Sequence, residues 1–208
     1  MVFFTSARNT YKNCLQTVNI KFISRKLIPV FMLTELFKTK ERVNILYYIL
    51  YQNAFTVKQV SKETGVTKGL VSRYLNYLNR AGLLNRLGNS YRTKDCAHTR
   101  AVKLLLNLNK LQIDSLDINW AAGTGIFGSW TQGTNTYESD LDVWVKVKAY
   151  PSEYELARLQ KDIRTMADVE VNLLVLTPEK IEGMKKADPP FYNSLIRTSV
   201  VLKGESIE

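Results

Sequence analysis

The sequence contains few of the residues that build most metal and redox sites. Its 208 residues include two cysteines, Cys14 and Cys96, and one histidine, His98. The cysteines are far apart and form no C-x-x-C pair, so neither a zinc site nor a disulfide framework is expected. A single histidine also excludes a metal site built from several imidazoles. We therefore expect a reduced, cytoplasmic protein.

Long hydrophobic runs are missing too. The longest, residues 27–33, contains Pro29 and is far shorter than the roughly 20 residues of a membrane-spanning helix. We therefore expect no membrane partner. No internal repeat or low-complexity tract is present, which argues against repeat architectures. With 45% apolar residues, the chain can form one large or two small packed cores.

Acidic residues are unevenly distributed along the chain. Residues 1–31 contain five Lys or Arg and no acid, residues 32–118 contain fourteen basic residues against six acids, and residues 119–208 contain ten against thirteen. A basic first part joined to a mildly acidic second part is typical of a nucleic-acid-binding module fused to a different domain.

Residues 1–31 lack the hydrophobic periodicity of a folded domain. Patterned sequence begins just after Met32, so the simplest interpretation is that translation starts there. A basic arm that contacts nucleic acid and a transit-like presequence are the alternatives. We treat residues 1–31 as a basic extension.

Residues 32–97 have the pattern of a small DNA-binding domain. Their periodicity predicts three helices, and their glycines predict a β-hairpin that follows the third helix: residues 36–51, 56–65, 68–81 and 83–93. Over residues 35–95 this pattern resembles the winged helix-turn-helix regulators. Winged helices also serve as dimerisation or protein-docking modules, so both uses stay open.

The side chains expected to contact duplex DNA are polar or basic, and they lie on the outward face of the third predicted helix or on the hairpin: Thr67, Lys68, Ser72, Arg73, Asn76, Arg86 and Arg92. These residue types donate hydrogen bonds to phosphates and to base edges. The helix face is nearly free of acids, which favours DNA as the partner.

Residues 98–118 are expected to form a linker helix. The segment 101–111 is too apolar to be a loose tether. Such a helix either packs on the winged domain or pairs with a second copy of the chain, which would give a homodimer.

The most informative segment of the chain holds two aspartates. Asp140 and Asp142 are separated by one residue in an extended strand, so they share a face and can hold a divalent cation, Mg²⁺ or Mn²⁺. Eleven residues before Asp140, the Gly128-Ser129 turn lacks bulk, and its N–H groups can approach a phosphate closely. Together these two features predict nucleotide chemistry.

A glycine-serine turn, a spacer containing Gly133, and Ser139-Asp140-x-Asp142 before an apolar strand resemble the DNA polymerase beta superfamily of nucleotidyltransferases. The spacing resembles its minimal subfamily over roughly residues 119–204. The resemblance implies an α+β protein overall, in which the winged domain precedes a small α/β nucleotidyltransferase domain with a mixed sheet at residues 119–208.

The resemblance also implies which residues bind the substrate. A nucleoside triphosphate would bind with its phosphates at Gly128 and Ser129, and Asp140 and Asp142 would hold Mg²⁺. An acceptor hydroxyl would then attack the α-phosphorus. Two further residues are candidates for nucleotide binding, one of them by stacking on the base: Ser139 and Trp130.

The third carboxylate of that family is not at its expected place. The apolar strand 169–176 puts Asn172 at the expected aspartate, with Glu170 two residues earlier on the same face. Glu170 is therefore the third catalytic candidate, beside Asp140 and Asp142. Asn172 is a candidate for nucleotide binding, because an amide oxygen can ligate a hard cation but cannot act as a base.

Three functions remain open at this point. The first is a Mg²⁺-dependent nucleotidyltransferase that a DNA-binding domain localises or regulates. The second is a non-enzymatic transcription regulator whose degenerate transferase domain senses a nucleotide. The third is the antitoxin of a toxin pair. The intact Ser-Asp-x-Asp sequence favours the first function, whereas Asn172 and the helix-turn-helix favour the second.

Overall fold

The computed structural model describes residues 33–208, so the predictions for residues 1–31 lie outside the described residues. Of the described residues, 33–44 belong to one unit and 45–208 to another. Within the first unit, the carboxylate of Glu35 pairs with Lys38 at 2.8 Å and with Arg42 at 2.5 Å.

The first predicted helix is shorter than expected. Helix α2 spans Lys40–Ile49, whereas the prediction ran from residue 36 to residue 51. The hydroxyl of Thr39 accepts a hydrogen bond from the N–H of Arg42 at 3.4 Å, and the carbonyl of Thr39 accepts from Val43. Thr39 thus starts the helix as a capping residue, which hydrophobic periodicity alone does not reveal.

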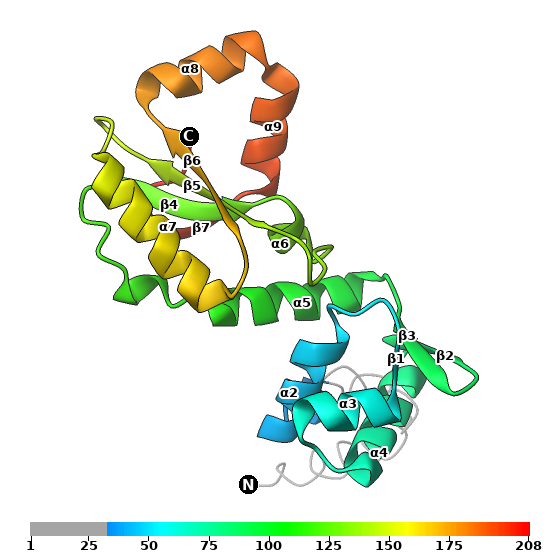
Figure 1. The fold of residues 1–208 in the computed structure, drawn as a ribbon. Coiled ribbons are helices and arrows are strands. Elements are labelled where there is room, and N and C mark those ends of the chain that lie inside the picture. Colours follow the sequence, from blue (N-terminus) through cyan, green and yellow to red (C-terminus); the bar gives the residue numbers. More distant parts are fainter. Residues whose placement is uncertain (1–32) are drawn as a thin grey trace, which may run out of the picture. The chain divides into compact units, whose positions relative to one another are not determined.

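The helix-turn-helix pair forms as predicted (Figure 1). Helix α3 spans Val57–Thr64 and has a reciprocal capping box between Thr56 and Gln59. It ends at Gly65, which has a φ of 69°. Helix α4 spans Lys68–Arg80 and buries the predicted apolar stripe: Val71, Tyr74, Leu75 and Leu78.

The predicted hairpin is also present. Strands β2 (Leu84–Leu87) and β3 (Ser90–Thr93) pair antiparallel. A further strand, β1 (Phe55–Thr56), pairs with the other edge of β3, giving the order β1-β3-β2. The sequence did not predict β1, because two residues are too few to show periodicity.

The linker region contains a helix, but this helix is shorter than the predicted range of residues 98–118. Helix α5 spans Ala97–Lys110 and is followed by a short 3₁₀ turn at Ile113–Ser115. Its side chains contact segments on both sides of it in the sequence. Tyr51 donates to Asn107 Oδ1 at 2.7 Å, and Asn107 Nδ2 donates to the carbonyl of Trp130 at 2.8 Å.

A four-stranded mixed sheet forms the centre of the carboxy-terminal half (Figure 1). Its strands in spatial order are β6 (Val171–Leu176), β5 (Leu141–Lys146), β4 (Gly123–Phe127) and β7 (Val200–Gly204). Strand β4 is antiparallel to both neighbours, whereas β5 and β6 are parallel. The parallel pair needs a crossover, which helix α7 (Glu153–Ala167) supplies.

Both faces of this sheet are covered. On one face, Leu141, Val143 and Val145 pack with Leu159 and Ile163 of α7. On the other face, Trp144 lies in a second cluster with four other buried residues from β6, α8 and α9: Leu176, Ile181, Tyr192 and Leu195. Strand β5 therefore alternates between two cores, which explains its nearly continuous apolar sequence.

Two helices connect β6 to β7. Helix α8 spans Pro178–Ala187, has a proline at its first position and is capped by Thr177. Helix α9 spans Pro189–Thr198 and was not predicted. Its cap is Asp188, whose carboxylate accepts from the N–H of Phe191 at 3.0 Å. None of the helices in residues 33–208 is long and apolar enough to cross a membrane.

Candidate active site and helix-turn-helix surface

The two aspartates lie at one end of the mixed sheet, where three strands meet. Asp140 precedes β5, and Asp142 lies within it, opposite Phe127 of β4 and Asn172 of β6. Because β5 and β6 are parallel and in register, their first residues lie side by side. The end of β4 carries the chain from Phe127 directly into the Gly128 turn.

Asn172 contacts both aspartates. Its amide nitrogen donates to Asp142 Oδ1 at 3.2 Å and lies 3.5 Å from Asp140 Oδ2. The pairing register therefore brings Asn172, and not a third carboxylate, into the group. In residues 33–208, no three His, Cys, Asp or Glu side chains cluster as metal ligands.

Gly128 fits this site because of its backbone conformation and because it lies against Asp142. Its φ is 74°, in the left-handed region that favours glycine. A Cβ atom at this position would lie 2.7 Å from Asp142 Oδ2. The turn expected to bind phosphate and the carboxylate expected to bind metal are thus in direct proximity. Ser129 follows at the start of the short helix α6 (Ser129–Gln132) and is partly exposed.

Ser139 shapes the loop before the aspartates. Its hydroxyl accepts a hydrogen bond from the N–H of Thr136 at 2.9 Å and lies 3.2 Å from the Thr136 hydroxyl. These contacts close a tight turn that leads into Asp140. The side chain was a candidate for nucleotide binding, and the structure shows it bonded within its own loop.

Trp130 is not available for base stacking. Its side chain is 1% exposed and packs in the core between the sheet and α5. A stacking residue needs an open ring face, so the prediction that Trp130 binds the nucleotide is wrong for this fold. Burial of an aromatic side chain below the turn is the physical reason.

Glu170 also takes a different position from the one expected. It lies one residue before β6, and its carboxylate forms an ion pair with Arg164 Nη2 at 2.5 Å. The structure therefore brings Asp140, Asp142 and Asn172 together but directs the Glu170 side chain to helix α7. In this arrangement Glu170 pairs with Arg164, and its use as a replacement for the third aspartate stays a prediction.

The donor set at the aspartates fits a Mg²⁺ ion. Asp140 is exposed and Asp142 is partly exposed, so their oxygens remain accessible to a cation. Two carboxylates, completed by substrate phosphates and water, are the ligands that Mg²⁺ prefers. Asn172 would have to turn its amide oxygen inward to join them.

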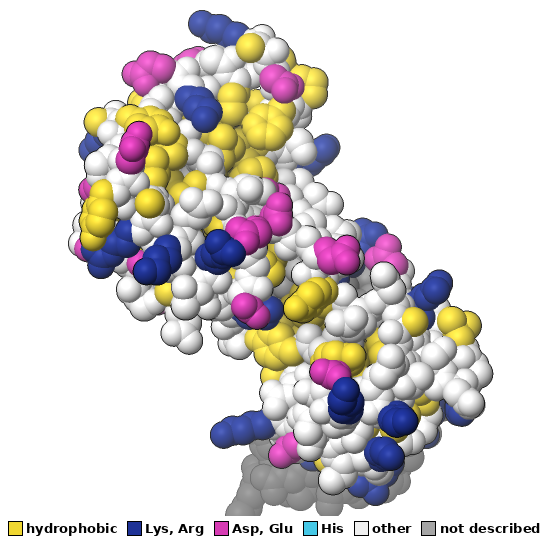
Figure 2. All heavy atoms as spheres, viewed as in Figure 1, with side chains coloured by type: hydrophobic (Ala, Val, Ile, Leu, Met, Phe, Trp, Pro, Cys, Tyr) yellow, Lys and Arg dark blue, Asp and Glu magenta, His cyan; other side chains and the backbone are white. Residues whose placement is uncertain are grey.

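Of the residues predicted to contact DNA, three on the amino-terminal part of α4 are exposed: Thr67, Lys68 and Arg73. Ser72 is partly buried. Asn76 is partly buried as well, and its Oδ1 accepts from the Tyr91 hydroxyl at 3.0 Å, which ties α4 to β3. Figure 2 shows Lys and Arg side chains gathered over α3 and α4 on the face in view.

The two arginines of the hairpin project from opposite faces of it. Arg86 lies opposite Tyr91 in the register, donates to the carbonyl of Gly88 at 3.1 Å, and lies over the Tyr91 ring. Arg92 follows Tyr91 in β3 and so projects from the opposite face of the hairpin. The prediction that Arg92 contacts DNA beside α4 is therefore not supported. Arg92 instead lines a cavity with Tyr51 and Lys103.

One set of buried polar residues was missed by the sequence reasoning. Lys103 and Asn107 are buried although they lie in an apolar helix, and both bond to Asn135. The signal was present, because two polar residues four positions apart share one face of a helix. Polar side chains on the buried face of an apolar helix are expected to have hydrogen-bond partners inside the protein.

Two protein-family models match separate stretches of the chain. Residues 39–86 match the family model described as bacterial regulatory protein, arsR family. Residues 112–193 match the model of the nucleotidyltransferase domain. A comparison with curated proteins gave no match.

Solved structures of two antitoxin complexes show partial similarity. A toxin–antitoxin complex with AMP-PNP is 19% identical with a TM-score of 0.33, and the match covers 53% of this chain and 76% of that one. The tri-AMPylated Shewanella oneidensis HEPN toxin in complex with MNT antitoxin is 15% identical with a TM-score of 0.30, covering 51% and 73%. The two family matches show that the chain contains an arsR-family helix-turn-helix domain at residues 39–86, followed by a nucleotidyltransferase domain at residues 112–193.

Proposed function

We propose that this protein transfers a nucleoside monophosphate from a nucleoside triphosphate to an acceptor hydroxyl in a Mg²⁺-dependent reaction. We also propose that its winged helix-turn-helix domain binds duplex DNA. The observation that supports the transfer best is the contact of the Gly128 turn with Asp142. It places a backbone suited to phosphates beside a carboxylate suited to a cation.

In this proposal the residues of the site bind the phosphates, hold the metal ion and accept the proton of the acceptor. The N–H groups at Gly128 and Ser129 orient the β- and γ-phosphates, which brings the α-phosphorus towards Asp140 and Asp142. These two carboxylates would hold Mg²⁺, and a bound ion would supply positive charge that offsets the charge of the phosphates. The acceptor oxygen forms a bond to the α-phosphorus while the bond to pyrophosphate breaks.

The proton of the acceptor needs a base other than Asn172. An amide cannot accept that proton. Glu170 is paired with Arg164, so the carboxylates of Asp140 and Asp142 are the bases that the chain offers nearest to the reacting atoms. Asn172 instead donates a hydrogen bond that holds the pair of aspartates in place.

Incubation with each labelled nucleoside triphosphate and Mg²⁺ tests the proposal. We expect label transfer to the protein itself, to RNA or to a co-purifying protein, and transfer to a protein is the outcome that an antitoxin role requires. Asp140→Asn and Asp142→Asn should each abolish transfer, because each removes a negative charge from the site without changing side-chain size. The matched control is Glu170→Gln, which removes the same charge nearby and should leave transfer unchanged. Loss of activity in the Glu170 variant would contradict the assignment.

The second candidate function is a nucleotide sensor without transfer. The presence of Asn172 between the aspartates favours it, since the site then has one carboxylate fewer than the family pattern implies. The sensor would bind nucleotide with Mg²⁺ in a calorimetric titration yet transfer no label. In that case Asn172→Asp should raise the Mg²⁺ affinity through one added negative ligand.

A further inference from the structure

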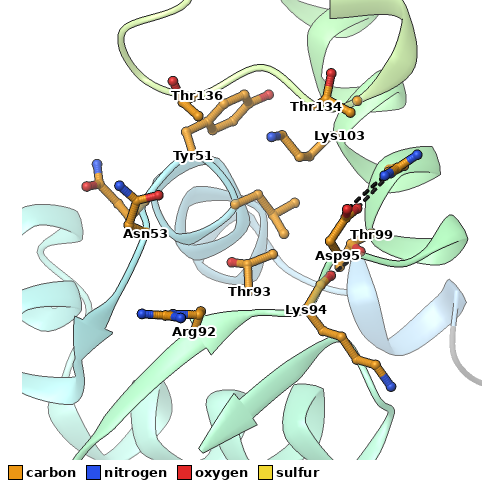
Figure 3. Close-up of a pocket in the computed structure, with 14 residues that line it drawn as sticks. Tyr51, Asn53, Arg92, Thr93, Lys94, Asp95, Thr99, Lys103, Thr134 and Thr136 are labelled. Atoms are coloured by element: carbon orange, nitrogen blue, oxygen red, sulfur yellow. Dashed lines mark hydrogen bonds and ion pairs between the residues drawn. The ribbon is translucent and has the colours of Figure 1, made fainter. Parts of the chain in front are cut away.

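A cavity of about 500 Å³ lies between the hairpin and helix α5 (Figure 3). Its walls come from the end of α2, from β3 and the loop after it, from α5, and from the loop that follows α6. The residues that line it include Tyr51, Arg92, Asp95, Arg100, Lys103 and Thr134. None of the residues assigned above to nucleotide or metal binding lines it.

Lys103 contributes a buried positive charge to this cavity. Its side chain is 93% removed from solvent, since only 7% is exposed. The ammonium donates to the carbonyl of Asn135 and lies 5.2 Å from the centre of the Tyr51 ring. Among the residues that the structure describes, no carboxylate forms an ion pair with it. A buried ammonium with donors to spare is costly unless an anion joins it.

The pKa of Lys103 reflects this environment. Burial lowers it from the usual lysine value to about 8. At neutral pH the group is therefore still mostly charged but easily discharged. An anion placed beside it would stabilise the charged form and raise its pKa again.

The remaining charges in the cavity wall leave a positive excess. Asp95 is the only acidic side chain in the wall, and it is bound to the Arg100 guanidinium through two contacts of 2.7 Å. Arg92 forms no ion pair within residues 33–208. After Asp95 and Arg100 neutralise each other, Arg92, Lys94 and Lys103 remain without counter-ions among the described residues, and the Lys94 side chain points away from the other two (Figure 3).

We propose that this cavity binds a small ligand that carries a phosphate or a similar oxyanion, held between the guanidinium of Arg92 and the ammonium of Lys103. Guanidinium groups bind tetrahedral oxyanions with paired hydrogen bonds, and a buried ammonium adds a strong point charge. Lys103 is too deeply buried for the backbone of duplex DNA to reach it, so the occupant is a small molecule.

The position of the cavity gives such a ligand a regulatory role. It would touch β3 of the winged domain and also the loop at Thr134, which leads to Asp140. The same loop is already tied to the end of α2, because the N–H of Tyr137 donates to the carbonyl of Tyr51 at 3.3 Å. Occupancy would therefore hold the winged domain and the aspartate loop in one arrangement.

A calorimetric titration of the full chain with inorganic phosphate, at constant ionic strength, tests the proposal. We expect one equivalent to bind to the parent and to the Asp140→Asn variant alike, because the aspartates are not part of this cavity. Lys103→Met and Arg92→Ala should each weaken binding about tenfold or more, as expected for a lost charge-assisted hydrogen bond.

The matched control is Lys94→Ala, which removes the same charge from another residue of the cavity wall. Figure 3 shows the Lys94 side chain pointing away from Lys103 and Arg92, so its loss should leave the affinity almost unchanged. The Arg92 side chain is exposed, so Arg92→Ala remains a test of the proposal even if Lys103→Met does not fold. The proposal is overturned if the parent binds no phosphate at millimolar concentration, or if the Arg92 and Lys94 variants bind equally. Neither result would affect the proposed nucleotide transfer.

Discussion

The two domains place their functional residues by different means. In the winged domain, the residues expected to contact DNA follow one another along the outer face of α4, and the inner face of the same helix fixes their direction. In the nucleotidyltransferase domain, Gly128, Asp142 and Asn172 come from three different strand ends and meet through strand register. We therefore expect the outer face of α4 to tolerate single substitutions. The aspartate site depends on close backbone contacts, which one added atom can disturb.

Gly128→Ala should have the largest effect, because it tests the backbone contact at the transferase site. The new Cβ would lie 2.7 Å from Asp142 Oδ2, and the φ of 74° would add about 1–2 kcal/mol of strain. We expect nucleotide transfer to fall by about 100-fold, the cost of a small misplacement of reacting groups. Transfer rates, measured with DNA affinity as an internal check on folding, provide the test.

Gly69→Ala is the matched control in the other domain. A Cβ atom on Gly69, in helix α4, would meet nothing within 4 Å. This change should stabilise the protein by about 0.5–1 kcal/mol, because alanine favours the helix. Equal losses of transfer in the Gly69 and Gly128 variants would remove the distinction between the two domains.

Lys68→Ala and Arg73→Ala should have an intermediate effect, confined to DNA. Both side chains are exposed on α4, so each removes about one phosphate contact. The slope of log affinity against log salt concentration should fall by about one unit for each change. Lys161→Ala, on exposed helix α7, removes the same charge from the other domain and should not alter the slope. A parent protein that binds no duplex DNA at low salt would instead identify the winged domain as a protein-docking module.

The last prediction concerns how the stability contributed by Lys103 depends on pH. The folded pKa of about 8 lies below the unfolded value of 10.5, so the unfolded chain binds more protons between these two values. Stability relative to Lys103→Met should therefore rise as the pH increases from 8 to 10.5, and stay constant below 8. Asp95 and Arg100 keep their charges in this range, because their hydrogen bonds to each other lower the pKa of the carboxyl group and raise the pKa of the guanidinium.

The measurement is denaturant unfolding of parent and variant at several pH values. Burial raises the pKa of Tyr51, which faces Lys103, above its usual value, so this phenol stays neutral in the same range. A difference between parent and variant that is flat from pH 7 to pH 10 would show that Lys103 is solvated in solution.

Features that depend on neighbouring residues could be predicted from the sequence. The capping box at Thr56 and the buried stripe of α4 are of this kind, and both are confirmed. The proline that starts α8 is another. In each case the interacting groups lie within four residues of one another, so their spacing determines the contact.

Features that depend on distant residues could not be predicted in this way. Trp130 lies next to the phosphate turn, but α5 and the sheet decide that it is buried. Glu170 shares a strand face with Asn172 in the sequence pattern, but Arg164 on α7 attracts its carboxylate. The direction of the Arg92 side chain could not be predicted either. It depends on which face of the hairpin packs on α4, and the pairing of β3 with its neighbours determines that face.

Helix α5 limits where the gene can recombine without disrupting the nucleotidyltransferase domain. The nucleotidyltransferase match begins at residue 112, yet Asn107 already bonds to Trp130, and a side chain at Gly133 would collide with the backbone of Arg100. A gene exchange at residue 111 would therefore give the transferase a foreign helix that lacks these complementary contacts. The segment from α5 to the last strand of the sheet therefore has to be exchanged as one piece. A different DNA-binding domain can replace the present one only if it packs against α5.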